Sequence, residues 1–118
     1  KQVKHVSGDT FIVQIGYMTH TRVYLVFGNR DEVSYITNGD VKVMDAEKLI
    51  FRVDQRKSYF KPGGAFWFDA LIDRHGKILD IVTTKTEENF KCMSRDELVR
   101  KSHLDFSRVG DHEVCVQY

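Results

Sequence analysis

The chain has 118 residues, an apolar content of 42% and a formal net charge of +1, which is typical of one globular domain spanning residues 1–118. So small a net charge does not by itself indicate a polyanionic partner. No apolar run approaches the ~20 residues of a membrane span, so we expect no membrane partner.

Two strands are predicted near the start of the chain. Residues 10–16 (TFIVQIG) and 22–28 (RVYLVFG) are rich in β-branched and aromatic side chains, which favour strands. The second of these segments is nearly continuous in apolar residues.

A hairpin is predicted around Asn38-Gly39, because both residues tolerate the positive φ of a type I′ turn. The strands on either side are residues 32–37 and 40–44. The predicted pairs are Ile36 with Val41 and Ser34 with Val43. Residues 48–54 are predicted as a further strand. Residues 55–64 hold the only proline and a Gly-Gly pair, which predicts a long loop.

The longest predicted hairpin covers residues 65–85. Asp73 at the first position and Gly76 at the fourth are typical of a type I turn followed by a bulge. Both strands are largely apolar on both faces, so we expect them to lie centrally in the fold. The register then pairs Ile72 with Ile78 and Phe68 with Val82. The predicted core residues are Phe66, Phe68, Ile72, Ile78 and Val82.

One helix is predicted to begin after Ser94 and to run to about His103. Ser94 is the N-cap, Glu97 completes a capping box, and Met93 with Leu98 forms a hydrophobic staple. A closing strand follows at residues 112–118, with Val114, Val116 and Tyr118 on one face.

The predicted fold class is α+β and mainly antiparallel β. About seven or eight short strands with one helix near the C-terminus indicate a bent sheet or a small barrel.

The candidate nucleic-acid-binding residues combine cations, which bind phosphates, with aromatic rings, which stack on bases. A solvated loop whose rings cap the sheet is the alternative. The residues are Arg52, Arg56, Lys57, Tyr59, Phe60 and Lys61.

The five histidines show no metal-binding spacing, so we expect no metal and no cofactor. A histidine beside a lysine or arginine can cleave RNA without metal. The histidines are His5, His20, His75, His103 and His112.

Asp69 and Asp80 interrupt the apolar faces of the long hairpin. A buried carboxylate needs a partner or its pKa rises. We expect each to pair with an arginine or to cap a backbone group. A catalytic acid or base is the alternative.

Cys92 and Cys115 have no CxxC spacing. A small secreted scaffold usually holds more cysteines, so two reduced thiols in a cytoplasmic protein are predicted, with one disulfide as the alternative. No signal-peptide pattern is visible. The sequence begins with Lys1, which leaves a removed targeting segment open.

Ser7-Gly8-Asp9 before an apolar strand resembles the small-barrel ribonuclease toxins of the PemK type. The hairpin from Asp73 to Ile81 resembles the last strands of PAS sensor domains. Each resemblance covers one turn and its flanking strand, and no residue role is carried over from it.

Three functions therefore stay open. The leading hypothesis is a small nucleic-acid-binding or regulatory domain that binds RNA or single-stranded DNA through residues 52–61, without catalysis. The second is a metal-independent ribonuclease. The third is a ligand- or protein-binding module, or a self-associating one, that uses the apolar face of the long hairpin.

Overall fold

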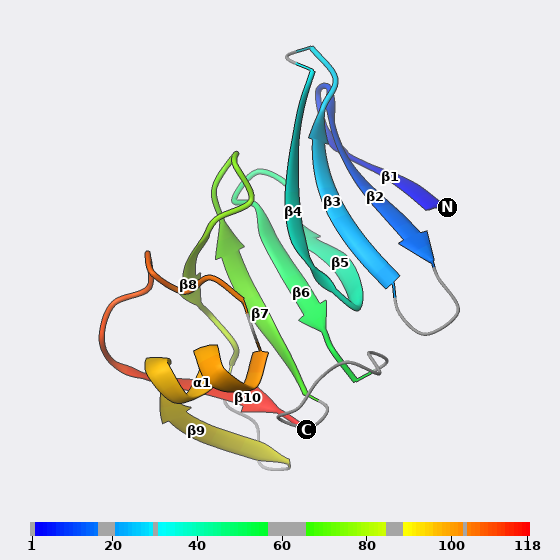
Figure 1. The fold of residues 1–118 in the computed structure, drawn as a ribbon. Helices are drawn as coiled ribbons and strands as arrows, with labels where there is room; N and C mark the ends of the chain where they lie inside the picture. Colours follow the sequence, from blue (N-terminus) through cyan, green and yellow to red (C-terminus); the bar gives the residue numbers. More distant parts are fainter. Residues whose placement is uncertain (1, 17–20, 30, 57–65, 85–88, 103) are drawn as a thin grey trace.

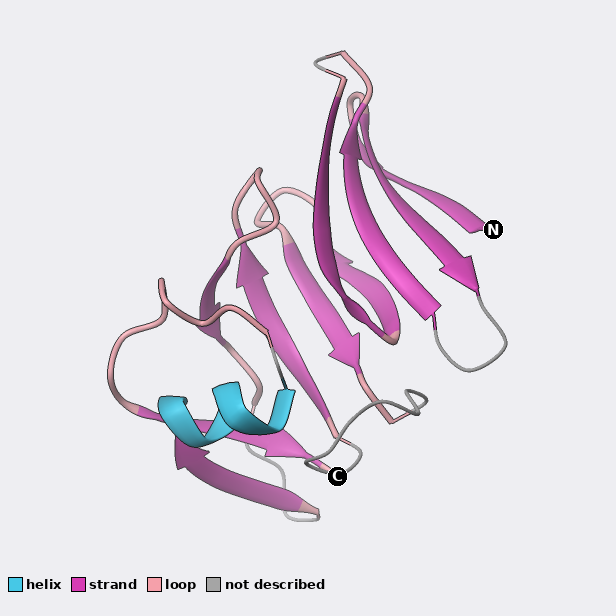
Figure 2. Ribbon diagram, viewed as in Figure 1, coloured by secondary structure: helices cyan, strands magenta, loops and turns pink. Residues whose placement is uncertain are grey.

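The structure, a computed structural model, describes residues 2–16, 21–29, 31–56, 66–84, 89–102 and 104–118. Within these ranges ten strands form two antiparallel sheets, and one helix lies near the C-terminus (Figures 1 and 2). The mainly antiparallel fold class with a C-terminal helix is confirmed. The barrel alternative is wrong, because the two sheets do not close on themselves.

Sheet A contains four strands in chain order. They are β1 (Gln2–Ser7), β2 (Thr10–Gly16), β3 (Thr21–Phe27) and β4 (Glu32–Asn38). Alternate residues on β2 and β3 are buried, as expected when one face of a sheet meets the core. The strands predicted at residues 10–16 and 22–28 are confirmed to within one residue.

Sheet B follows the path β5-β6-β7-β10-β9, and β8 pairs with β7. Its strands are β5 (Asp40–Asp45), β6 (Ile50–Asp54), β7 (Trp67–Ile72), β8 (Ile78–Ile81), β9 (Phe90–Ser94) and β10 (Glu113–Gln117). β7 pairs with three strands, as its apolar sequence predicts, whereas β8 pairs with β7 alone among the described strands. The sequence analysis did not predict β9.

Asn38-Gly39 does not form the predicted hairpin. β4 pairs with β3 in sheet A and β5 pairs with β6 in sheet B, so the chain passes between the sheets at Gly39. Gly39 has a φ of 125°, and a Cβ there would collide with the carbonyl oxygen of Asp54. The permissive backbone of glycine therefore serves a sheet crossing rather than a turn. The predicted pairs Ile36–Val41 and Ser34–Val43 are consequently wrong.

The turn of the long hairpin is confirmed, but its register is not. The Asp73 N–H donates to the Lys77 carbonyl at 3.0 Å, and Ile72 faces Ile78 as predicted. A β-bulge next to Ile72 then pairs Leu71 with Asp80. Beyond the bulge, this one-residue shift reverses which side chains of the second strand face inward. The predicted pairing of Phe68 with Val82 is therefore wrong, and Val82 is 38% exposed rather than in the core.

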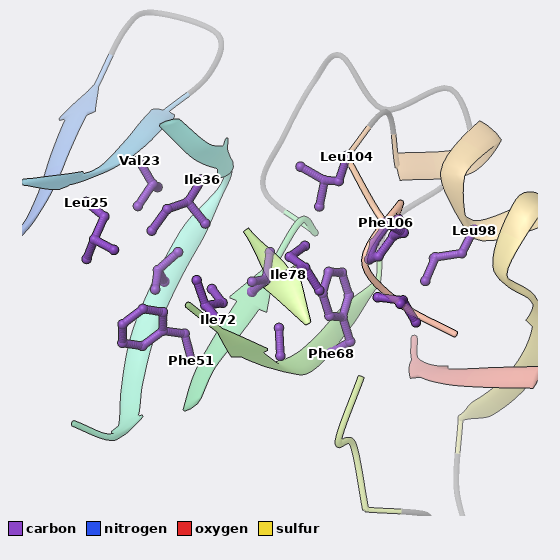
Figure 3. Close-up of a cluster of buried hydrophobic side chains, with 14 of the residues drawn as sticks. Val23, Leu25, Ile36, Phe51, Phe68, Ile72, Ile78, Leu98, Leu104 and Phe106 are labelled. Carbon is purple, nitrogen blue, oxygen red and sulfur yellow. The ribbon is translucent and has the colours of Figure 1, made fainter. Parts of the chain in front are cut away.

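The inner faces of both sheets meet in one apolar core (Figure 3). In Figure 3, Val23 and Leu25 of β3 lie opposite Phe51 of β6, and all three are buried. The other end of the core packs against the helix and the segment that follows it. Buried residues there include Phe68, Leu98, Leu104 and Phe106. Four of the five predicted core residues are buried, namely Phe66, Phe68, Ile72 and Ile78.

The helix α1 (Arg95–Ser102) begins where the capping residues predict. Ser94 Oγ accepts a hydrogen bond from the Glu97 N–H at 3.2 Å, and both Met93 and Leu98 are buried. This cap satisfies one of the free N–H groups at the start of the helix. The predicted end of the helix, His103, lies outside the described residues.

Within the part of the chain that the structure describes, the helix α1 lacks the length and apolarity that a membrane crossing requires.

Candidate functional site

Arg52, a predicted phosphate ligand, already has two partners on sheet B. Its Nε donates to Asp69 Oδ1 at 2.9 Å on the neighbouring strand, and its guanidinium lies 4.0 Å from the centre of the Trp67 ring. The Asp69 side chain is only 13% exposed, so an unpaired carboxylate there would be costly. Arg52 therefore neutralises Asp69, which confirms that this aspartate pairs with an arginine.

Arg56, the second predicted cation that the structure describes, is also paired. Its Nε and terminal nitrogen donate to the two oxygens of Asp54 at 3.0 and 2.6 Å. The hydrogen bond that Arg56 donates to Asp54 raises the pKa of Arg56 above its ordinary value. Lys57, Tyr59, Phe60 and Lys61 lie outside the described residues. The structure thus places two of the six predicted ligands, and a carboxylate binds each of them.

The described histidines each have a partner of their own. His5 Nε2 lies 2.7 Å from the Gly8 carbonyl oxygen, and His75 Nδ1 lies 2.8 Å from Glu32 Oε1. His112 Nε2 lies 3.6 Å from the carboxylate of Asp80. His20 and His103 lie outside the described residues. Asp80 also accepts a hydrogen bond from the Ile81 N–H at 2.8 Å, so it caps a backbone group as predicted.

A hollow of about 500 Å³ between β4 and the turn of the β7–β8 hairpin is lined by both a histidine and a lysine. His75 and Lys77 line it. Lys77 Nζ lies 3.3 Å from Asp105, whose pKa falls from 3.8 to about 2 because of hydrogen bonds from Ser107 and, to a smaller extent, from Lys77. Both basic groups therefore face carboxylates, which holds them in place and lowers their attraction for phosphate.

The strand pairing gives sheet A a largely apolar outer face. Three cross-strand rows of side chains make up this face. The first row is His5, Phe11, Val26 and Val33. The second row is Val3, Val13, Tyr24 and Tyr35. The third row is Ile15, Arg22 and Asn38.

This face exposes large apolar groups although the inner face of the same sheet fills the core. Val3, Val33 and Tyr35 are 56%, 58% and 49% exposed. Partial burial raises the pKa of Tyr35, so its hydroxyl is uncharged near neutral pH. His5 and Arg22 are then the chargeable side chains of the three rows.

The β3–β4 side of the face holds an aromatic pair and a hollow. The rings of Tyr24 and Tyr35 lie 5.7 Å apart in an edge-to-face arrangement. These two tyrosines, Arg22 and Asn38 line a hollow of about 340 Å³. This surface was not predicted from the sequence. The apolar character of both faces of residues 10–16 and 22–28 could have revealed it, because such strands are usually covered on both sides.

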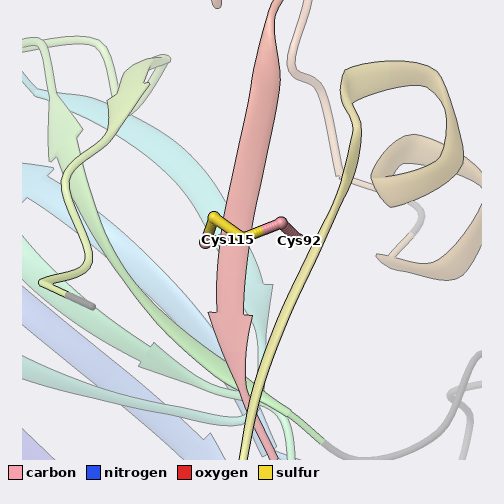
Figure 4. The surroundings of a disulfide bond; sticks show 2 residues. All are labelled: Cys92 and Cys115. Atoms are coloured by element: carbon pink, nitrogen blue, oxygen red, sulfur yellow. A yellow bond between two sulfur atoms is a disulfide. The ribbon is translucent and has the colours of Figure 1, made fainter. Parts of the chain in front are cut away.

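The two cysteines form a disulfide between β9 and β10 (Figure 4). Cys92 and Cys115 are direct cross-strand partners, and both are half-buried. The prediction of two reduced thiols is therefore wrong. The sequence separation of 23 residues gave no sign of the pairing, because β9 itself was not predicted.

No protein-family model matches this chain, and neither does any curated protein or solved structure. The similarities to ribonuclease toxins and PAS domains accordingly stay resemblances of single turns.

Proposed function

We propose that this chain is a protein-binding module that associates with a second copy of itself through the outer face of sheet A. The observation that carries the proposal is the set of eight apolar or aromatic side chains on this face, drawn from all four strands. Extended apolar patches exposed on a protein surface often mark sites of protein–protein interaction.

The size of the face suits a weak dimer. Four strands about 4.8 Å apart, each rising ~3.3 Å per residue over roughly six residues, cover about 400 Å² in projection. Side-chain relief increases the accessible area to roughly 600 Å² on each partner, the lower end of the range for specific interfaces. We therefore expect a dissociation constant in the micromolar range.

The chemistry of the face also favours a second copy. Two twisted sheets can pack face to face, about 10 Å apart, when their side chains interdigitate. An isologous contact sets each row against the same surface of the partner. The hollow beside Tyr24 and Tyr35 can then receive a side chain of the other copy. Few charged groups would be buried, since His5 and Arg22 are the chargeable members of the rows.

Sedimentation velocity over a concentration series tests the proposal. The dimer fraction should rise with concentration in the wild type and should be absent in the double variant Val33→Lys, Tyr35→Lys. Met44→Lys is the matched control, because Met44 is 50% exposed on sheet B. A wild type that stays monomeric at several hundred micromolar would overturn self-association. An equal loss in the Met44→Lys control would overturn the choice of surface.

Nucleic-acid binding through residues 52–61 is the second candidate function. Its support is the exposed side of Arg56, whose side chain is 48% exposed, and the stacking of Arg52 on Trp67. Arginine and aromatic groups of this kind bind single strands. The carboxylates of Asp54 and Asp69 oppose it, because a phosphate would have to compete with them.

Titration of labelled single-stranded RNA and DNA at low and moderate salt tests this second candidate. Replacing Arg56 and Lys57 by Ala should weaken binding and flatten its salt dependence by about two units if each side chain contacts one phosphate. Lys48→Ala is the control, because Lys48 is exposed between β5 and β6 and lies outside this segment. Cleavage without added metal would favour the ribonuclease alternative, with His75 and Lys77 as the first positions to change.

The disulfide indicates the kind of cellular compartment in which the chain would act. Stable disulfides are typical of oxidising compartments and rare in the cytoplasm. We therefore propose an oxidising compartment in place of the expected cytoplasmic location. Detection of free thiols in the protein isolated from its source under thiol-blocking conditions would contradict this.

A further inference from the structure

We propose that reduction of the Cys92–Cys115 disulfide opens a zinc site made of the two thiolates and the carboxylate of Glu113. Cys92 on β9 and Cys115 on β10 are paired directly across the sheet. Glu113 stands two residues before Cys115 on β10 and therefore projects on the same face. The two sulfur atoms and a carboxylate oxygen of Glu113 all lie within 4.8 Å of one another.

The three groups match the ligand preference of zinc. Zn²⁺ binds thiolate sulfur at about 2.3 Å and carboxylate oxygen at about 2.0–2.2 Å in a tetrahedral arrangement. Tetrahedral ligands at these distances lie roughly 3.5–3.8 Å from one another. Once the sulfur–sulfur bond is broken, side-chain rotations can bring the three atoms to this separation, because they start within 4.8 Å. Water would complete the fourth position.

The site is accessible from solvent. Cys92 and Cys115 are half-buried and Glu113 is exposed, so a reductant and a metal ion can both reach them. Figure 4 shows the disulfide spanning the gap between the two strands. β9 is the last strand on its side of sheet B, and the disulfide ties it to β10. A bound zinc ion would keep this tie after reduction.

The chemistry balances with a dithiol as the reductant. The dithiol supplies two electrons and two protons, the sulfur–sulfur bond breaks, and two thiols form while the dithiol becomes a disulfide. Zinc binding then displaces the two thiol protons, since zinc coordinates the thiolate form. Glu113 contributes a carboxylate oxygen to the metal.

Cobalt titration of the full chain tests the site. The protein is reduced with a dithiol, freed of excess reductant without oxygen, and titrated with Co²⁺. One cobalt ion per chain should bind with thiolate-to-cobalt absorption bands, and Zn²⁺ should displace it. The oxidised protein should show no such bands.

Variants separate this site from nonspecific thiol binding. Glu113→Gln should weaken cobalt binding by about tenfold or more, because loss of even a supporting group near a metal commonly costs that much. Cys92→Ser should abolish the thiolate bands of a two-sulfur site. Glu97→Gln, which removes a partly exposed carboxylate on α1, should leave affinity unchanged. Equal affinity of the wild type and Glu113→Gln would overturn the proposal.

The fold of the reduced chain gives a second readout. If reduction loosens the β9–β10 hairpin, zinc should restore the circular dichroism and the amide protection of these strands. Zinc that neither binds with thiolate bands nor restores this protection would also overturn the site.

Discussion

Sheet A and sheet B bury their inner faces in the same core but differ on their outer faces. The outer face of sheet A carries rows of apolar side chains, with Tyr24 and Tyr35 paired across β3 and β4. Sheet B instead places Arg52, Asp69 and Trp67 on adjacent strands, where they bind one another. Sheet B thus satisfies its polar groups within the chain, whereas sheet A leaves apolar area that a partner can cover.

The inner faces are covered by different elements. Sheet A meets the β5–β6 part of sheet B, while the β7–β10 part packs on α1 and Phe106. Among the described residues, sheet B is therefore the structural centre, and sheet A has an outer face on which Val3, Val33 and Tyr35 are exposed. The predictions below test this division, beginning with the largest effect.

Removal of a core ring from sheet B should cost far more than truncation on the outer face of sheet A. Phe68 is fully buried and its ring lies 5.9 Å from that of Phe106. Phe68→Ala should lower the free energy of unfolding by about 3–5 kcal/mol. Val33→Ala should change it by less than about 0.5 kcal/mol. Urea denaturation of dilute protein measures both, and similar losses would mean that the outer face of sheet A is covered within the monomer.

The crossing between the two sheets depends on Gly39. Gly39→Ala places a Cβ against the backbone of Asp54 at a φ of 125°, so it should destabilise the protein by about 1–3 kcal/mol. Gly16→Ala is the control, because an added Cβ there meets nothing within 4 Å. Thermal and urea unfolding of both variants measure the difference in stability between them. Equal stability would show that the crossing tolerates a side chain.

The helix cap at Ser94 should stabilise α1, which packs on sheet B, without affecting sheet A. Ser94→Ala removes the hydrogen bond to the Glu97 N–H and should cost about 0.5–2 kcal/mol. Amide exchange should show faster opening of residues 95–102, with the strands of sheet A unchanged. Ser94→Asp should retain the cap and the protection. Loss of protection in sheet A as well would mean that the two sheets unfold as one unit.

The smallest effect concerns Asp105, next to the hollow between the sheets. Its folded pKa of about 2 is below the ordinary 3.8, so its contribution to stability is present above pH 3.8 and lost as the pH falls through 2. The side chain is 53% exposed, so solvent screening keeps the effect small. Wild type should exceed Asp105→Asn in stability at pH 5, and the difference should disappear as the pH falls below 2. A difference that is constant over this range would contradict the assignment.

Features that depend on adjacent residues could be predicted from the sequence. The Asp73–Gly76 turn, the Ser94 cap and the strand at residues 10–16 each follow from local hydrogen bonding, backbone preference or side-chain shape. Their neighbours along the chain supply all the necessary partners. The burial of Phe66, Phe68, Ile72 and Ile78 also follows, because alternation along a strand places them on one face.

The candidate site was harder to predict from the sequence than these local features. Arg52 and Arg56 were recognised, and Asp69 was expected to pair with an arginine. The sequence did not show that this arginine is Arg52, or that Arg56 pairs with Asp54. Asp69 comes from the next strand, and the pairing of Arg52 with it depends on the register of β6 and β7. The apolar pattern of β2 and β3 was visible, yet only the pairing of all four strands shows that their second faces form one surface.

By itself the sequence determined the local elements and the mainly antiparallel class, because these depend on preferences and periodicities within a few residues. Only the tertiary structure decided that Gly39 passes the chain between sheets, that a bulge beside Ile72 shifts the hairpin register, and that Cys92 meets Cys115. Each of these depends on contacts between segments far apart in the chain, where packing of whole sheets outweighs the preference of any one turn.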